Sequence, residues 1–341
     1  MKRFLMLFSL VALFLALSTR MSFAAECTQT GFFRDGTNMT AALINPVGTV
    51  SGEVNATGCN VGVYYDNGTG TLNNAEIYGS NYFGVLVNGD VNEVTVNIRE
   101  SKIHNIGEVP FNGAQHGVAV YYRSLGTGGV FGEISGSSVY EYQKGGIVAN
   151  GNATVSVRNN IVTGNGPVPY IAQNGIQYGW GATGQIQGNT VADHSYTGSN
   201  YAADGGILIV GGPCYGFPFS YTKNVQIVKN TLIDNDVGVY LSNLDVVSDS
   251  CVAPVIETNI KVVNNTISND YVTNISGYTY PGTIGYQAGI SDQGNNDKLI
   301  NNKISGTGYD KLADDLTSYL RLIDASDSFT NNVKIHANKF Q

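Results

Sequence analysis

Gly206-Ile207-Leu208-Ile209 is followed 32 residues later by Gly238-Val239-Tyr240-Leu241, and the same short stretch returns along much of the chain. Most of the intervals between its copies are 29 to 33 residues long, and one is 51. Regular copies of one unit are typical of a solenoid, in which each repeat packs only on its neighbours. The copies begin at Gly84-Val85, Gly117-Val118, Gly146-Ile147, Gly175-Ile176, Gly206-Ile207, Gly238-Val239 and Gly289-Ile290.

A second series of short stretches advances with the first and begins with asparagine. In both series the apolar residues alternate, so they share one strand face and would form a continuous apolar column when the units stack. Asparagine tolerates a left-handed backbone, and its amide both donates and accepts, so we expect these residues to form a ladder along the stack. The series comprises Asn160-Ile161-Val162, Asn189-Thr190-Val191, Asn230-Thr231-Leu232, Asn265-Thr266-Ile267 and Asn302-Lys303-Ile304.

The combined pattern, Asn-x-Ile…Asn…Gly-Ile-x-Leu over residues 60–305, resembles the right-handed parallel β-helix of the pectin-lyase-like superfamily. The resemblance implies an all-β fold, a single-stranded right-handed parallel β-helix with N- and C-terminal caps. It leaves the chemistry open, because the superfamily includes polysaccharide lyases, epimerases, glycoside hydrolases, phage tailspikes and non-catalytic surface proteins. Apart from the N-terminus, the clearest helix candidate is the segment 309–322.

The chain divides into a targeting segment, two caps and the repeat. Lys2 and Arg3 followed by an apolar run from Phe4 to Leu17 predict a signal peptide over residues 1–24, of a type common in bacteria. Residues 25–59 and 306–341 are predicted to cap the solenoid at its two ends. We therefore expect a secreted or periplasmic protein with no membrane insertion once the signal is removed.

The four cysteines all follow the signal segment, which favours two disulfides in an exported chain. Cys27 and Cys59 bracket the N-terminal cap. Cys214 and Cys251 lie in insertions after the Gly-Ile/Val strands of successive coils and would project from the same edge. These positions predict the pairs Cys27–Cys59 and Cys214–Cys251, and no metal site.

The chain is acidic, with 18 Lys and Arg against 26 Asp and Glu, for a formal net charge of −8. Loss of Lys2, Arg3 and Arg20 with the signal changes this to −8 − 3 = −11. This charge argues against nucleic acid and anionic membranes as partners. A polyanionic sugar would need a local basic groove or bridging Ca²⁺.

The connections from the asparagine strands to the next Gly-Ile/Val strands differ in length. Four are long (105–116, 164–174, 193–205 and 269–288), whereas the connection at 141–145 is short. We expect long loops on one edge to wall a groove over residues 105–205, with the short coil as its floor. Aromatic, amide and carboxylate side chains there would suit a polysaccharide or cell-surface glycan. The expected binding residues are Gln115, Tyr140, Glu141, Tyr142, Tyr170, Gln173, Asn174, Trp180, Asp193, Tyr201 and Asp204.

Proton transfer at a uronate is the first enzymatic hypothesis for this groove, as in a lyase or epimerase. His116 or His194 with Tyr196 would exchange the proton, and Lys144 would stabilise the enolate-like charge. Asp193-His194 is similar to the Asp-Pro-His core of mannuronan epimerases, but it lacks the proline. No cofactor is expected.

Three other functional hypotheses stay open. A glycoside hydrolase would use paired carboxylates from among Glu141, Asp193, Asp204 and Asp234. A non-catalytic envelope or adhesin-like protein would use the groove only as a glycan cradle. A periplasmic metal-handling β-helix, similar to those of nitrous oxide reductase maturation, would need close histidine or cysteine pairs, which the chain lacks.

Overall fold

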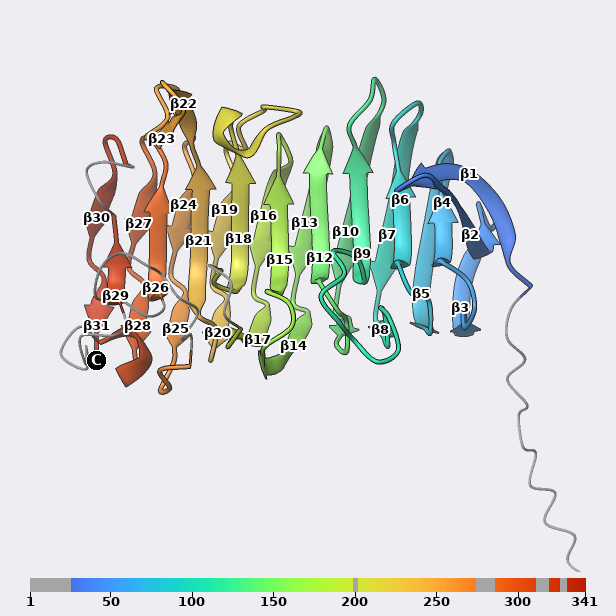
Figure 1. Ribbon diagram of the computed structural model, residues 1–341, viewed down its shortest axis with the longest axis horizontal. Helices are drawn as coiled ribbons and strands as arrows, with labels where there is room; N and C mark the ends of the chain where they lie inside the picture. Colours follow the sequence, from blue (N-terminus) through green and yellow to red (C-terminus); the bar gives the residue numbers. More distant parts are fainter. Residues whose placement is uncertain (1–25, 199–201, 274–285, 311–318, 326–329) are drawn as a thin grey trace, which may run out of the picture.

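The chain winds into a right-handed β-helix whose coils stack along one axis (Figure 1). The structure is a computed structural model that describes residues 26–198, 202–273, 286–310, 319–325 and 330–341. Within these described residues, an 11-stranded sheet, sheet A, forms one side, and the 18 strands of sheet B form two further columns. The all-β solenoid predicted from the repeat is confirmed. No helix among the described residues has the length and apolarity needed to cross a membrane.

Sheet A contains one strand per coil, and apart from an antiparallel first pair its strands are all parallel. Val120, Ile147, Ile176, Ile207 and Val239 occupy equivalent places and are fully buried. The strands are β1 (Thr28–Arg34), β2 (Thr37–Ile44), β4 (Val61–Tyr65), β6 (Phe83–Asn88), β9 (Val118–Ser124), β12 (Gly145–Gly151), β15 (Asn174–Gly179), β18 (Gly205–Gly211), β21 (Val237–Asn243), β26 (Tyr286–Gln293) and β29 (Tyr319–Asp324).

Close backbone approach explains the repeated glycine of sheet A. A Cβ on Gly146 would lie 2.5 Å from the carbonyl oxygen of Gly175, and one on Gly175 would lie 2.6 Å from that of Gly206. In the coil that contains β9, the repeat predicts Val118 as the equivalent of Ile147. The structure instead pairs Val120 with Ile147. Ala119 therefore takes the glycine position in that coil, and Gly117 ends the preceding loop with a φ of 85°.

The first column of sheet B follows sheet A in each coil. It is formed by part of β3 (Thr49–Asn55) and of β5 (Gly68–Tyr78), then β7 (Glu93–Arg99), β10 (Gly129–Ser135), β13 (Ala153–Arg158), β16 (Thr183–Gln187), β19 (Gln226–Val228), β24 (Lys261–Val263), β27 (Lys298–Ile300) and β30 (Lys334–His336).

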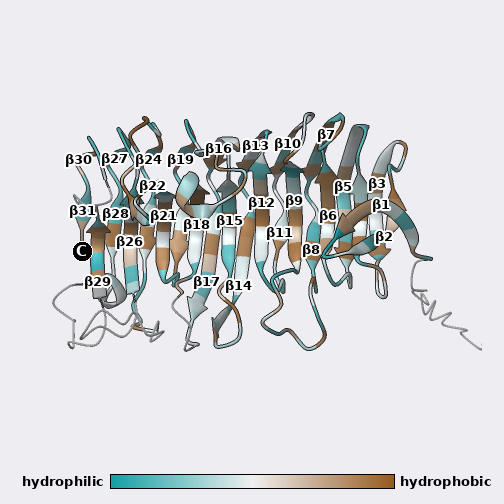
Figure 2. Cartoon of the chain, turned by 45° about the horizontal axis from the view of Figure 1, so that its top comes forward, coloured by the Kyte–Doolittle hydropathy of each residue, from teal (hydrophilic) through white to brown (hydrophobic). Residues whose placement is uncertain are grey.

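The second column of sheet B leads back to sheet A. After the ends of β3 and β5 it comprises β8 (Lys102–His104), β11 (Ser138–Val139), β14 (Ile161–Val168), β17 (Thr190–Tyr196), β20 (Thr231–Ile233), β25 (Thr266–Ser268), β28 (Lys303–Ser305) and β31 (Lys339–Phe340). The apolar side chains of the three columns meet inside, and hydrophobic bands recur at matching levels in neighbouring strands (Figure 2).

A buried asparagine ladder joins the coils where the two columns of sheet B meet. Oδ1 of Asn230 accepts from the backbone N and from Nδ2 of Asn189, both at 3.0 Å, and Asn230 bonds Asn265 in the same way. The expected ladder is confirmed from Asn160 to Asn302, and Asn338 extends it by one coil.

Each ladder residue follows a residue with left-handed backbone, such as Asn159 (φ 54°), Gly188 (φ 67°) or Lys229 (φ 56°). This conformation favours asparagine and glycine, and it turns the next side chain into the interior. The turn and the ladder therefore recur together.

Strand pairing extends into both segments predicted as caps. β2 and β3 already pair parallel with β4 and β5, so the first coil begins before residue 60. The antiparallel β1–β2 hairpin lies beside it, fixed by the Cys27–Cys59 disulfide. At the other end β29, β30 and β31 add a further coil. The predicted signal peptide, residues 1–24, lies outside the described residues.

The helix predicted over 309–322 is wrong for its described C-terminal part. Residues 319–322 belong to β29, which pairs with β26, and Leu320 is fully buried. Pairing with the preceding coil overrides the local helix preference. Residue 309 ends a short 3₁₀ turn, η2 (Thr307–Tyr309), and residues 311–318 are not described.

The second predicted disulfide, Cys214–Cys251, is also present, with its Cα atoms 5.6 Å apart. Cys214 lies in η1 (Pro213–Tyr215) after β18. Cys251 lies in the hairpin of β22 (Asp245–Val247) and β23 (Ser250–Val252), after β21. The bond joins the loops of successive coils at one edge.

Two carboxyl groups are buried together at the end of β26. Asp297 accepts hydrogen bonds from Thr258 Oγ1 and the Ile260 backbone N, both at 2.7 Å. Burial and the nearby charge of Asp297 raise the pKa of Asp292 well above its usual range, and burial raises the pKa of Asp297 to about 6. The pair therefore holds a proton at a pH where exposed aspartates hold none.

Replacing Asn230 with alanine should lower the free energy of unfolding by about 3 kcal/mol, because buried donors of Asn189 and a buried acceptor lose their partners. Urea denaturation monitored by circular dichroism measures this change. Gln226→Ala, at an exposed position of the same coil, should change the stability by less than about 0.5 kcal/mol. Equal effects of the two variants would contradict a structural role for the ladder.

The Asp292–Asp297 pair should make stability fall as pH rises. A carboxyl whose pKa is raised in the folded state contributes fully below the unfolded value of about 3.9 and loses its contribution as pH rises through the folded value. Asp297 loses its contribution to stability between about pH 4 and 6. The raised pKa of Asp292 extends this range to higher pH. Asp292→Asn mimics the protonated acid, so it should be more stable than wild type at pH 8. Its free energy of unfolding should also fall less between pH 5 and pH 8 than that of wild type.

Urea denaturation at the two pH values tests this, with Asp249→Asn as the control on an exposed turn. The explanation fails if Asp292→Asn and wild type show the same pH dependence.

Candidate functional site

A cavity of about 350 Å³ opens on the outer face of sheet A, over β6, β9, β12 and β15. Its apolar floor includes Phe83, Tyr121 and Val148, which are at most 7% exposed. We call it the sheet A pocket. Its walls come from the strand ends and from the β1–β2 hairpin, and it is lined by Arg34, Phe83, Gln115, His116, Val118, Tyr121, Leu125, Lys144, Gly145, Val148, Asn150, Gln177, Trp180, Phe217 and Pro218.

The sheet A pocket gathers four of the residues predicted to act: Gln115, His116, Lys144 and Trp180. Its charged groups are Arg34 and Lys144, with His116 as a further titratable group. None of the described residues that line it is aspartate or glutamate, although the chain carries a net charge of −8. Arg34 forms an ion pair with Asp35, which is not a lining residue (Nε to Oδ2, 3.5 Å), and His116 lies against Glu108. Lys144 is therefore the cationic lining residue that has no described carboxylate within ion-pair distance.

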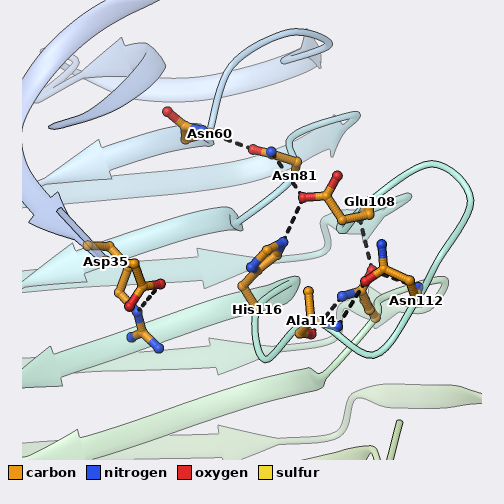
Figure 3. Close-up of polar contacts among 9 residues, drawn as sticks. Asp35, Asn60, Asn81, Glu108, Asn112, Ala114 and His116 are labelled. Atoms are coloured by element: carbon orange, nitrogen blue, oxygen red, sulfur yellow. Dashed lines mark hydrogen bonds and ion pairs between the residues drawn. The ribbon is translucent and has the colours of Figure 1, made fainter. Parts of the chain in front are cut away.

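His116 is held by a carboxylate and a ring. Its Nε2 lies 2.7 Å from Oε1 of Glu108, and its ring stacks on Tyr82 with centroids 3.9 Å apart. An ionised carboxylate only accepts, so Nε2 carries the proton and Nδ1 of the neutral ring can accept one. Glu108 also accepts from Asn81, which accepts from Asn60, so a polar chain leads from the N-terminal coil to His116 (Figure 3).

Gln143, which is fully buried, fixes the loop that carries His116. Its Oε1 accepts from the backbone N of Glu108 at 3.0 Å and of Asn112 at 3.3 Å, and its Nε2 donates to the carbonyl of Ala114 at 2.7 Å. This long loop is therefore anchored at three points. Sequence reasoning missed this role.

Lys144 precedes β12 at the floor of the pocket. Its Nζ donates to the carbonyl of Ala172 at 2.7 Å, and no described carboxylate lies within ion-pair distance. Burial lowers the pKa of Lys144, and the charge of Asp204 partly offsets this. An incoming anion would therefore meet an ammonium group that lacks a close carboxylate partner.

Aromatic side chains form the far end of the pocket. Trp180 directly follows β15 and itself has left-handed backbone (φ 49°). Phe217 belongs to the loop after β18 and also lines the pocket. The Cys214–Cys251 disulfide holds this loop, and Phe217 is 72% exposed. Flat apolar rings therefore line the same cavity as Lys144.

Five predicted site residues lie in the interior, so they do not line the groove. Tyr142, Gln173, His194 and Asp204 are fully buried, and Tyr196 is 2% exposed. Nδ1 of His194 lies 2.7 Å from Oδ1 of Asn235, and its Nε2 contacts the hydroxyl of Tyr142. Burial lowers the pKa of His194 to about 4, so the ring is neutral near pH 7. These contacts serve packing between coils.

Left-handed turns explain the inward placement. Glu141 (φ 49°) precedes Tyr142, and Asp193 (φ 62°) precedes His194. Each turn directs the next side chain inside, as Asn105 (φ 52°) does for Ile106. A polar residue with left-handed backbone, followed by a residue that points inward, recurs from coil to coil. This recurring pair is the sequence signal that could have revealed the burial of Tyr142 and His194.

Tyr140 and Glu141 lie on the outer face of sheet B, away from the sheet A pocket. The ring of His104 stacks between Tyr78 and Tyr140, with centroids 5.4 and 4.8 Å away. Glu141 lies 3.8 Å from Nδ1 of His104. These residues form a surface stack of their own.

The remaining predicted residues are dispersed. Asp193 shares a separate cavity of about 270 Å³ with Asp234, and burial raises the pKa of both carboxyls. Asn174 accepts from the backbone of Gly205, and Tyr170 is half-buried outside the sheet A pocket. Tyr201 lies outside the described residues. No group of three or more His, Cys, Asp or Glu among the described residues is arranged to hold a metal ion.

Comparison with known proteins identifies the fold family. The family described as "Right handed beta helix region" matches residues 43–211 and 92–253. No curated protein matches the chain.

Replacing Gln143 with alanine should loosen the loop over residues 105–116, because two backbone donors and one carbonyl lose their partner. We expect faster amide hydrogen exchange at Glu108 and Asn112 and a stability loss of about 2 kcal/mol. Gln115→Ala, at an exposed position of the same loop, is the control and should leave both amides unchanged. Unchanged exchange in Gln143→Ala would show that the loop is held by other contacts.

Proposed function

The chain belongs to the right-handed β-helix family, and we propose that it binds acidic carbohydrate in the sheet A pocket. One observation carries the proposal: the pocket combines aromatic rings and cationic or amide donors with no carboxylate among its described lining residues. A saccharide offers an apolar ring face to aromatic groups and hydroxyls to polar ones. Its family, generally associated with carbohydrate, supports the same ligand class.

The cations favour a sugar that bears a carboxylate. Lys144 lines the pocket with no described carboxylate within ion-pair distance, and Arg34, which is paired with Asp35 at 3.5 Å, also lines it, whereas the chain as a whole is acidic. A partly desolvated ammonium interacts more strongly with an anion than a fully hydrated one does. A uronate carboxylate at Lys144 would restore the charge that burial disfavours.

The size of the pocket limits what it holds. A volume of about 350 Å³ lies near the lower end of the range of small-molecule sites, roughly 300 to 1,000 Å³. This volume suits one or two sugar rings of a longer glycan. Trp180 and Phe217 would contact a ring whose acidic neighbour lies at Lys144.

A second candidate is a lyase or epimerase that acts in the same pocket. The paired His116 and Glu108, beside Lys144, favour it. Nδ1 of His116 would remove the proton α to the uronate carboxylate, and Lys144 would stabilise the enolate-like charge. In a lyase the β C–O bond then breaks as a C=C bond forms, and an acid protonates the leaving oxygen. The Tyr121 hydroxyl lines the pocket and is a candidate for that acid. An epimerase would instead return a proton to the opposite face.

The two disulfides support an extracellular or periplasmic location, because such bonds persist in oxidising compartments. A glycan of the cell surface or surroundings is then within reach.

Lys144→Gln should weaken binding of polygalacturonate at least about tenfold, which corresponds to about 1.4 kcal/mol. Isothermal titration calorimetry with polygalacturonate, alginate and neutral dextran measures the affinities. Lys102→Gln, an exposed lysine on β8, is the control and should bind as wild type. Equal binding of acidic and neutral glycans, or no binding of either, would overturn the proposal.

The enzymatic candidate is tested on the same polymers. Unsaturated products detected by ultraviolet absorbance would establish a lyase, and loss of this signal in His116→Ala with unchanged thermal stability would place His116 in the reaction. Exchange of the α-proton with deuterated water, followed by NMR, would reveal an epimerase. Binding without either signal leaves the non-catalytic role.

A further inference from the structure

We propose that a second cavity, beside the β1–β2 hairpin, binds a neutral sugar unit of the same glycan, so that the ligand is an acidic heteropolysaccharide. This inference rests on the proposed function of the sheet A pocket. The cavity measures about 570 Å³ and lies between the hairpin and the turn after β6. We call it the hairpin pocket. The residues used below are Phe33, Tyr64, Asp66, Asn88, Asp90 and Arg123.

The hairpin pocket contains the groups that a sugar requires. Phe33, on the hairpin, is 63% exposed and offers a ring face. Asp66 and Asp90 provide carboxylate acceptors for hydroxyl groups. Tyr64 lies beneath them: it is 2% exposed, its hydroxyl accepts from Nδ2 of Asn88 at 3.2 Å, and burial, as the main cause, raises its pKa to about 12.

Its charges differ from those of the sheet A pocket. The one cation among its described lining residues, Arg123, is already paired with Asp90 and donates to Oδ1 of Asn88 at 2.8 Å. The partners of Oδ1 of Asp66 are the uncharged amides of Asn45 and Asn67, at 2.8 and 3.0 Å. Two carboxylates against one paired cation disfavour a uronate and favour a neutral sugar.

The two pockets are close neighbours on the outer face of sheet A. Consecutive residues of β1 contribute to both, Phe33 to the hairpin pocket and Arg34 to the sheet A pocket. On β9, Arg123 lines the hairpin pocket and Tyr121 lines the sheet A pocket. These two residues lie on the same face of the strand, and two residues of a strand span about 7 Å. One oligosaccharide can therefore reach both pockets.

The hairpin that separates the pockets is fixed in place. The guanidinium of Arg123 lies 4.9 Å from the ring centroid of Phe32, and Asp90 also accepts from the backbone N of Leu125 at 2.8 Å. Coils and hairpin thus form one preorganised surface, which reduces the ordering cost of binding.

The test compares three probes on the full chain: polygalacturonate oligomers (acidic only), gellan oligomers (acidic and neutral units) and cello-oligosaccharides (neutral only). We expect gellan to bind at least about tenfold more tightly than polygalacturonate, about 1.4 kcal/mol. Phe33→Ala should remove this gain and leave polygalacturonate binding unchanged. Phe33→Tyr should retain it, and Phe131→Ala, an exposed phenylalanine on β10, should have no effect.

Each failure is distinguishable. If wild type binds polygalacturonate through Lys144 but gellan no more tightly, or if Phe33→Ala leaves the gellan affinity unchanged, the hairpin pocket is refuted and the sheet A pocket stands. An equal loss for both ligands in Phe33→Ala would show that Phe33 only positions Arg34, which also refutes the second site. If no probe binds wild type, the proposed function itself fails.

Discussion

The structure depends on the hydrogen bond that each buried asparagine makes to its counterpart in the next coil. From Asn189 to Asn338, each Oδ1 accepts both the backbone N–H and the side-chain amide of the asparagine in the coil before it. The bond forms only if the preceding residue adopts left-handed backbone, so turn and ladder specify each other. On sheet A, the glycine column fixes the spacing independently, since a Cβ there would collide with the next carbonyl. Two local constraints thus set the register that positions every loop.

Much of the fold could be predicted because both constraints leave visible residues. Glycine at the close approach and asparagine at the ladder are the residue types that the geometry demands. Prediction failed where another residue satisfies the same geometry, as Ala119 does in place of glycine. It also failed at residues 319–322, where pairing with β26 decides the structure and nearby sequence does not. The first coil went unrecognised because β2 and β3 lack the repeated pair.

The candidate site could be predicted only in part. Gln115, His116, Lys144 and Trp180 meet because they flank strands whose order the repeat fixes. Tyr142 and His194 point inward because one left-handed residue reverses the side-chain direction, which spacing alone does not reveal. Arg34 and Phe217 were missed because they belong to segments outside the repeat, a terminal hairpin and an inserted loop. The lining of this pocket therefore comes from additions to the solenoid as well as from its coils.

The Cys214–Cys251 bond has a mechanical consequence. A solenoid whose coils touch only their neighbours unravels from its ends under tension, one coil after another. A covalent link between the loops of two adjacent coils interrupts that sequence, because the chain between residues 214 and 251 cannot be drawn out while the bond is intact. Pulling from the C-terminus would strip the coils after residue 251, and the load would then pass through the disulfide directly to Cys214. The bond therefore shields the coil between its two cysteines from tension.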